Sequence, residues 1–253
     1  MSADRTLLFN RLEAKYLVDR TTRTALLRDL TALMRPDIHS NPGGSYQVRS
    51  LYFDTANYMA YHEKMAGTAV RHKLRIRAYG DDPSLTSTIR LEVKSRYLDH
   101  IHKIVVDVSP EDYSEIEWAL KHRTLPPARL IKDSNSSKEF FRLQRQFNME
   151  PVIIVQYRRQ AFERREVNRV RVNFDDELIA SRNLDLLGSL KGGRRLLQYG
   201  HAILEIKVDN ALPYWLHMLI SKYNLQNEAV SKYCYAVRSQ ARLSMAGREK
   251  GGF

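Results

Sequence analysis

The feature that most constrains the fold is a period-two alternation of charged and apolar side chains that recurs along the chain. Between residues 70 and 79, Arg and Lys occupy four successive alternate positions, while apolar residues and one His occupy the positions between them. Successive side chains of a β-strand point to opposite faces, so this pattern predicts a strand with one charged and one apolar face. Similar segments predict strands over residues 7–18, 46–53, 70–79, 88–96, 101–108, 151–159, 168–175 and 202–209.

The predicted strands are joined mostly by short connections, which favour antiparallel pairing. Apolar positions at helical spacing indicate helices as well, with Thr21 or Thr22 and Ser109 as expected N-caps. The chain therefore predicts an α+β fold built on an antiparallel sheet. No repeat or linker divides it, so we expect one domain over residues 1–253. The expected helices cover residues 21–34, 109–122, 138–147, 213–223 and 230–243.

The composition favours an anionic partner and a reducing compartment. Lys and Arg number 41 against 29 Asp and Glu, which gives a formal net charge of +12. The single cysteine, Cys234, excludes an internal disulfide, so we expect a cytoplasmic protein in which this residue only packs. No segment has the apolar length of a signal peptide or a membrane span, although a membrane partner stays open. No helix-turn-helix, RRM or zinc-finger pattern occurs, so we expect no specific nucleic acid partner.

A single strand with a charged face has an ordinary explanation, the solvated side of a sheet that packs on its other side. Five strands of this kind in one chain favour a different explanation. The four cations from Arg71 to Arg77 would stand side by side and repel one another unless an anion lies among them. An Arg guanidinium donates two parallel hydrogen bonds to a phosphate and stays charged at any working pH. The pattern therefore indicates a bound polyanion that contains phosphate.

Three carboxylates on the same predicted faces, Glu13, Glu92 and Glu205, would repel a phosphate chain. A hard divalent cation resolves this conflict, because it takes carboxylate oxygen on one side and phosphate oxygen on the other. Cations for phosphates together with a few carboxylates for a metal are typical of phosphoryl-transfer sites. We therefore expect Mn²⁺ or Mg²⁺ as the cofactor, with these three glutamates as its ligands.

Eight short segments also occur in the order found in one family: RLEAKY (11–16), SLYFDT (50–55), RIRAYG (75–80), LEVKSR (91–96), YRRQAFE (157–163), VRVNFD (170–175), ILEIK (203–207) and SKY (231–233). In these segments the chain resembles the VTC-type polyphosphate polymerase domain, a branch of the triphosphate tunnel metalloenzymes, over nearly its whole length. The resemblance implies that the antiparallel sheet closes into a β-barrel tunnel, with helices packed outside and a C-terminal helix that closes it.

The resemblance also implies roles for individual residues. Arg75 and Arg77 match the paired arginines that grip the triphosphate, and Lys15 matches the lysine of the first strand. Lys232 matches the lysine on the closing helix, and Glu205 resembles the metal-binding glutamate. We expect the four basic residues among these to be catalytic. The substrate-binding residues expected along the tunnel are Arg71, Lys73, Lys94, Arg96, Lys103, Arg159, Arg169, Arg171 and Lys207.

One departure from the family bears on the reaction. Hydrolytic relatives carry ExExK on the first strand, whereas Arg11 stands at the first of these glutamate positions. Loss of that carboxylate favours a polymerase that transfers the γ-phosphate of ATP to a polyphosphate chain. Two alternatives stay open. One is a tripolyphosphatase or nucleoside triphosphatase in which Glu13 or Glu92 orients a water, and the other is a module that binds polyphosphate or triphosphate anions without turnover.

Overall fold

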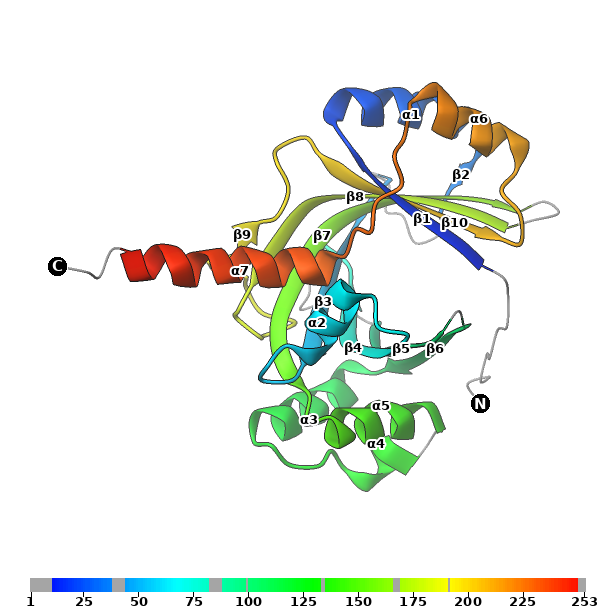
Figure 1. The fold of residues 1–253 in the computed structure, drawn as a ribbon. Coiled ribbons are helices and arrows are strands. Elements are labelled where there is room, and N and C mark those ends of the chain that lie inside the picture. Colours follow the sequence, from blue (N-terminus) through cyan, green and yellow to red (C-terminus); the bar gives the residue numbers. More distant parts are fainter. Residues whose placement is uncertain are drawn as a thin grey trace.

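The computed structural model describes residues 11–37, 44–81, 88–98, 100–132, 135–165, 169–190 and 192–249 (Figure 1). The described strands form one antiparallel sheet in the order β1-β10-β8-β7-β3-β4-β5-β6, with two short strands, β2 and β9, paired to β7 and β8. The strands are β1 (Arg11–Val18), β2 (Arg35–Pro36), β3 (Tyr46–Asp54), β4 (Val70–Tyr79), β5 (Ile89–Tyr97), β6 (His100–Val108), β7 (Glu150–Arg165), β8 (Arg169–Ser181), β9 (Arg194–Arg195) and β10 (Ala202–Asp209).

The sheet curls into a half-barrel, and the long strands β7 and β8 bend through its centre (Figure 1). Register shifts lie between Tyr52 and Phe53 on β3 and between Gln156 and Arg158 on β7, and such irregularities bend and twist a strand. Within the described residues no ladder joins the end strands β1 and β6. The two ends nevertheless face each other, because Lys94 Nζ of β5 lies 3.3 Å from a Glu13 carboxylate oxygen of β1.

Helices pack on the outer, apolar side of the half-barrel (Figure 1). The helices α1 (Arg20–Leu33) and α6 (Tyr214–Lys222) bury Leu26, Leu30 and Leu216 against β1, β8 and β10. At the other end, Phe140 and Tyr113 pack against β3, β4 and β5. They belong to α5 (Asn135–Gln146) and α3 (Pro110–Lys121), which are connected through α4 (Ala128–Lys132). Burial of the apolar strand faces leaves the charged faces toward the hollow.

The last helix, α7 (Lys232–Glu249), starts on the inner side of the sheet. The segment that leads to it follows the end strand β1, where Glu228 N donates to Lys15 O at 2.8 Å and Lys15 N donates to Asn227 Oδ1 at 3.1 Å. Tyr233 of α7 then stacks on Tyr52 of β3, with ring centroids 5.2 Å apart. The helix thus covers part of the inner face, and α2 (Met59–Ala66) lies beside it.

Each predicted strand and helix corresponds to an observed element whose bounds differ from the prediction by a few residues, and residues 7–10 and 168 lie outside the described part. The buried packing role of Cys234 and the N-cap Ser109 are also confirmed. The N-cap of α1 was predicted wrongly. Asp19 holds this position, and its carboxylate accepts from Thr22 N at 2.7 Å, so the helix starts earlier than Thr21.

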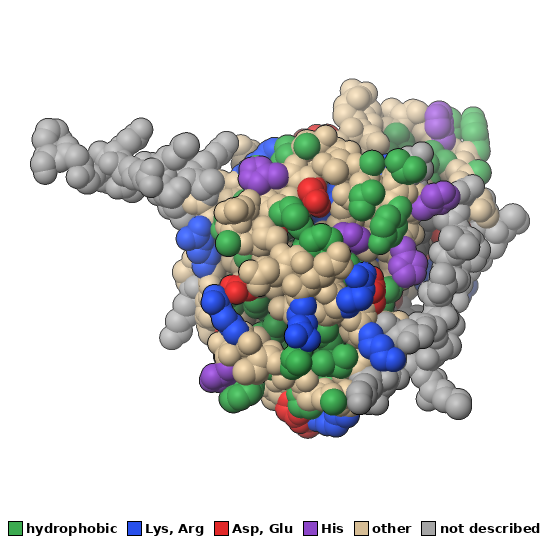
Figure 2. All heavy atoms as spheres, turned by 60° about the horizontal axis from the view of Figure 1, so that its bottom comes forward, with side chains coloured by type: hydrophobic (Ala, Val, Ile, Leu, Met, Phe, Trp, Pro, Cys, Tyr) green, Lys and Arg blue, Asp and Glu red, His purple; other side chains and the backbone are tan. Residues whose placement is uncertain are grey.

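The face that carries α3, α4 and α5 comes forward in Figure 2, and basic side chains are scattered on it among hydrophobic and histidine side chains. The net positive charge of the chain is therefore not gathered on this face, and the inner face of the half-barrel is where cations stand close together.

Among the described helices, none is long and apolar enough to cross a membrane.

Candidate functional site

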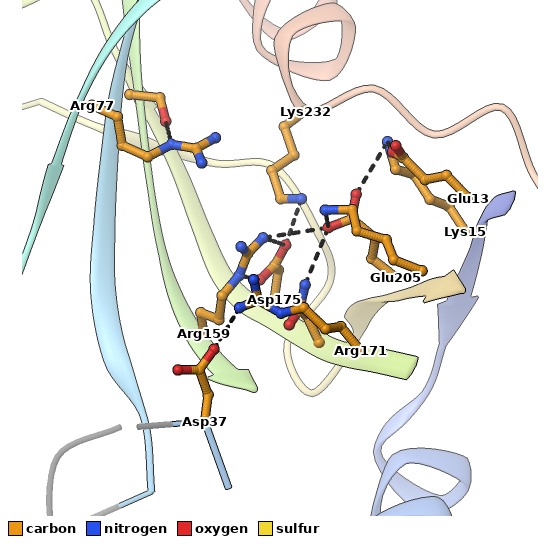
Figure 3. A network of polar contacts seen from close by, with 12 residues as sticks. Glu13, Lys15, Asp37, Arg77, Arg159, Arg171, Asp175, Glu205 and Lys232 are labelled. Atoms are coloured by element: carbon orange, nitrogen blue, oxygen red, sulfur yellow. Dashed lines mark hydrogen bonds and ion pairs between the residues drawn. The ribbon is translucent and has the colours of Figure 1, made fainter. Parts of the chain in front are cut away.

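The charged faces of β1, β8 and β10 meet inside the half-barrel (Figure 3). Lys15 Nζ lies 2.9 Å from Glu13 Oε1 and 3.6 Å from Glu205 Oε1, so it joins two carboxylates on neighbouring strands. Lys207 Nζ lies 2.8 Å from the other oxygen of Glu205. Further ion pairs extend this cluster to β5, β7 and α7. It is hereafter the Glu205 network, and its members are Glu13, Lys15, Lys94, Arg159, Asp175, Glu205, Lys207 and Lys232.

A buried carboxylate, Asp175, joins the sheet to α7 within this network. Arg159 Nε and Nη2 donate to its two oxygens at 2.7 and 2.8 Å. Lys232 Nζ, at the start of α7, lies 2.6 Å from Asp175 Oδ2. The second nitrogen of Arg159, Nη2, also lies 3.6 Å from Glu205 Oε2. Lys232 and Arg159, predicted from distant parts of the sequence, are thus brought together with Glu205.

A second cluster, hereafter the Glu92 network, lies on β4, β5 and β6. Arg75 donates to Glu92 Oε2 through Nε at 2.7 Å, and its Nη2 lies 2.5 Å from the same oxygen. Arg77 Nη1 lies 3.4 Å from Glu92 Oε1, and Lys103 Nζ lies 3.8 Å from it. The paired arginines are therefore held in place by a carboxylate that is only 3% exposed. In this position Glu92 is fully engaged with cations, and its role as a metal ligand stays a prediction.

The carboxylates of both networks are held ionised. Burial alone would raise the pKa of Glu205, but Lys207, Lys15, Lys232 and Arg159 bring it well below the ordinary value. Burial would also raise the pKa of Glu92, but Arg75, Arg77 and Lys103 lower it below the ordinary value. The pKa values of Glu13 and Asp175 are also lowered by neighbouring cations against the effect of burial.

Lys73 has no carboxylate partner among the described residues, although it is partly buried on the inner face. It stands directly across from Lys94 in the β4–β5 ladder, and Lys94 stands directly across from Lys103 in the β5–β6 ladder. Burial lowers the pKa of Lys73 to about 8, and the nearby Lys64 adds to this effect. Three lysines at one level of the sheet repel one another, so this row favours an anion as a neighbour.

Four predicted substrate-binding residues have their partners outside both networks, although Arg171 stands directly across from Lys207 in the β8–β10 ladder and lies beside the Glu205 network in Figure 3. Arg169 Nη2 lies 2.6 Å from Glu163, and Arg171 pairs with Asp37. Arg71 Nη1 donates to the Thr68 carbonyl at 2.6 Å, and Arg96 Nε donates to the Leu98 carbonyl at 2.6 Å. These four cations are thus engaged with groups outside the two networks, and their contact with a substrate stays a prediction.

Sequence reasoning missed two residues of the site, Asp175 and Asn173. Both stand at alternate positions on the charged face of β8, in the VRVNFD segment. Asn173 Nδ2 donates to Glu205 Oε2 at 3.3 Å, while its Oδ1 is buried and has no hydrogen-bond partner within the described part. A carboxylate placed among expected phosphate ligands was the available signal for Asp175, but its partners become visible only in the folded chain.

The two networks together carry a surplus of positive charge. In the Glu205 network five cations face three carboxylates, and in the Glu92 network three cations face one. Within one folded chain such an excess is destabilising by self-repulsion and is relieved by a bound anion. Planar Arg forks and flexible Lys side chains are the donors that proteins use for phosphate groups. The arrangement can therefore hold a polyanion between the networks.

The residues present also fit a divalent cation. Glu13 and Glu205 are brought together at Lys15, and the orphaned Oδ1 of Asn173 lies beside Glu205. All three groups offer oxygen, which Mg²⁺ and Mn²⁺ prefer. In the described residues, no group of three or more His, Cys, Asp and Glu side chains is arranged to hold a metal. The protein would thus supply part of the coordination, and phosphate oxygens would supply the rest.

The geometry and the comparisons agree on the class of protein. The fold is similar to a candidate adenylate cyclase from Bacillus halodurans, with a TM-score of 0.50 and 13% identity over 87% of this chain and 93% of that one. It is also similar to the candidate adenylyl cyclase HpAC1 from Hippeastrum, with a TM-score of 0.52 and 14% identity over 90% of this chain and 96% of that one. The curled sheet is therefore a triphosphate tunnel fold.

The family follows from the sequence itself. The model of the VTC domain matches residues 10–240, which is most of the chain. No curated protein matches it. The chain belongs to the VTC domain family, as the eight segments in order had predicted.

Proposed function

We propose that this protein is a polyphosphate polymerase-type phosphotransferase that moves the γ-phosphoryl group of ATP onto a phosphate chain inside the half-barrel. Arg75, Arg77, Lys15 and Arg159 would hold the triphosphate, and Lys232 would neutralise the charge that develops on the leaving diphosphate. Glu205, with Glu13 and Asn173, would hold Mn²⁺ or Mg²⁺. When bound, the metal would neutralise phosphate charge and orient the reacting oxygens.

The observation that carries this proposal is that both networks combine surplus cations with carboxylates that are all ion-paired. A general base works best with a pKa near the working pH, whereas Glu13, Glu92, Asp175 and Glu205 all have lowered pKa values. An ionised phosphate end needs no base to attack, while a water does. The site is thus suited to hold two polyanions close together and in line, so that catalysis rests on positioning and charge neutralisation.

A second candidate function is hydrolysis of triphosphates. HpAC1 has a dominant triphosphatase activity, and it shares the fold of this chain. In this alternative Glu13 or Glu92 would orient a water, although Glu92 is occupied by Arg75 and Arg77. A third possibility is a module that binds polyphosphate without turnover. The metal-suited group at Glu205 supports an enzyme over such a module.

One assay separates these functions. The purified protein is incubated with ATP and Mn²⁺, with and without a short polyphosphate primer, and the products are separated on a gel while free phosphate is measured. We expect long polyphosphate together with ADP. Free phosphate without polyphosphate would support the triphosphatase instead. Binding of tripolyphosphate without any turnover would leave only the binding module.

Tripolyphosphate affinity is expected to fall as the pH rises from about 7 to about 9, because Lys73 loses its proton near its pKa of about 8. Below this pKa the lysine is charged and attracts phosphate, and above it the attraction is lost. Burial first, and then the charged neighbours Lys64, Lys15 and Lys94, keep this pKa low in the free protein. Isothermal titration calorimetry should show a decrease of roughly fivefold.

Lys73→Met is the matched control for this pH dependence. It removes the titrating group and leaves the titration of the ligand itself unchanged. The variant should bind more weakly at the lower pH and show a shallower decline. An equally steep decline in the Lys73→Met protein would mean that another group is responsible, such as Lys207, whose pKa burial also lowers to about 8.

A further inference from the structure

Asp175 links the last helix to the sheet through ion pairs. Its side chain is fully buried, and its register partner across the β7–β8 ladder is Arg159. One carboxylate receives the fork of Arg159 at 2.7 and 2.8 Å and the ammonium group of Lys232 at 2.6 Å (Figure 3). Both cations are also close to the ring of Tyr157, at 5.3 and 4.9 Å from its centroid. Two cations from different elements therefore share one anion.

This sharing leaves donors free for a ligand. Arg159 uses Nε and Nη2 on Asp175, and within the described residues Nη1 makes no hydrogen bond. An ammonium group has three protons, and Asp175 is the one carboxylate recorded within ion-pair distance of Lys232 in the described part. The group of three keeps one net positive charge, so it can still attract phosphate. Without the carboxylate, the two cations would repel each other and lose their fixed directions.

The other anchor of α7 does not involve these cations. The hydroxyl of Tyr233, the next residue after Lys232, donates to buried Asp54, which also accepts from the backbone of Ala60 and Tyr61 in α2. The start of α7 is thus held at two adjacent residues by two buried carboxylates. Asp54 holds the helix by accepting from the neutral hydroxyl of Tyr233, whereas Asp175 holds it through the cation Lys232, which faces the site.

We infer that Asp175 is a positioning residue, whose buried carboxylate holds Arg159 and Lys232 in the directions needed to bind phosphate and ties α7 to the substrate. This inference rests on the proposed function. A stabilising role alone would be served as well by apolar packing, because burial of an ion pair costs desolvation that its attraction barely offsets. Apolar packing would not provide what Asp175 provides, which is two cations that share one carboxylate and keep further donors free for a ligand.

The test is a double-mutant cycle in tripolyphosphate binding, measured by calorimetry without metal on the full chain. The proteins are the unsubstituted chain, Asp175→Asn, Lys232→Met and the double variant. We expect Asp175→Asn to weaken binding by about tenfold, although the loss of a negative charge would by itself strengthen the binding of an anion. We also expect Lys232→Met to weaken binding about tenfold in the unsubstituted chain and less than about twofold in the Asp175→Asn background.

Controls separate positioning from folding. Asp176→Asn changes the next residue, which pairs with Arg23 at 2.8 Å outside the network, and Tyr233→Phe removes the other anchor of α7. Neither control should change tripolyphosphate affinity by more than about twofold. If Asp175→Asn does not fold, a cycle between Arg159→Lys and Lys232→Met measures the same coupling. The double variant should then lose less binding free energy for tripolyphosphate than the sum of the losses in the two single variants.

The outcomes are distinct. The positioning role would be overturned if Lys232→Met reduced tripolyphosphate affinity equally in the unsubstituted chain and in the Asp175→Asn background, or if Asp175→Asn bound tripolyphosphate more tightly. Either result would leave the proposed function intact. Additive losses in the second cycle would overturn the positioning role in the same way. An unsubstituted chain that does not bind tripolyphosphate would overturn the proposed function and this inference together.

Discussion

Glu205→Gln is expected to reduce metal-dependent turnover by roughly 100-fold or more, while tripolyphosphate binding without metal stays the same or becomes tighter. A neutral amide is a poor ligand for Mn²⁺ or Mg²⁺, so the metal would no longer be held beside the phosphates. The same substitution releases Lys15, Lys207 and Arg159 from the carboxylate and leaves them free to meet an anion. Turnover should therefore fall, while the affinity for tripolyphosphate without metal should stay the same or rise.

Asp107→Asn is a suitable control, since this carboxylate on β6 is 68% exposed and pairs with Arg90 outside both networks. It should leave turnover and binding unchanged. Titration with Mn²⁺, monitored by electron paramagnetic resonance, tests the metal site without any assay of activity. Normal turnover by the Glu205→Gln protein, or unchanged Mn²⁺ affinity, would show that the metal is held elsewhere.

The sheet was predictable from the sequence because both faces of its strands are strongly specified. In β4, for example, Leu74 and Ile76 are fully buried against the outer helices, while Arg75 and Arg77 face inward. A shift of one residue would exchange these faces at a large energetic cost. The alternation therefore predicts that the segment is a strand and which of its side chains face inward, and it disfavours a shift of the strand by one residue.

The partners of the inner charges were not predictable in the same way. The sequence places Arg171 and Arg159 at equivalent positions on charged faces, yet Arg171 pairs with Asp37 and Arg159 with Asp175. Which carboxylate meets which cation depends on the curl of the sheet and the path of loops. The helix α2 was missed for a related reason, because its first turn is capped from β3, where Asp54 accepts from Ala60 N. Only the fold brings these groups together.

Arg77→Ala is expected to weaken tripolyphosphate binding by roughly 100-fold and to lower stability by about 2 kcal/mol. The Arg77 side chain is 8% exposed and donates to Ser50 Oγ at 3.3 Å and to the hydroxyl of Tyr79 at 3.2 Å. Its removal takes a fixed donor from the triphosphate grip and leaves Glu92, buried, with fewer cations. Calorimetry measures the binding, and thermal unfolding measures the stability.

The two effects can be separated with a second substitution. Arg77→Ala combined with Glu92→Gln removes the buried negative charge that the first change leaves under-compensated, so part of the lost stability should return. Affinity should not return, because the guanidinium itself is what meets the phosphate. Arg90→Ala removes the same charge from the position directly across the ladder, where the side chain is engaged with Asp107, and it should weaken binding by less than about threefold. If Arg77→Ala/Glu92→Gln bound tripolyphosphate like the unsubstituted chain, or if Arg90→Ala were as damaging as Arg77→Ala, the Glu92 network would act only through its overall charge and not by gripping the ligand.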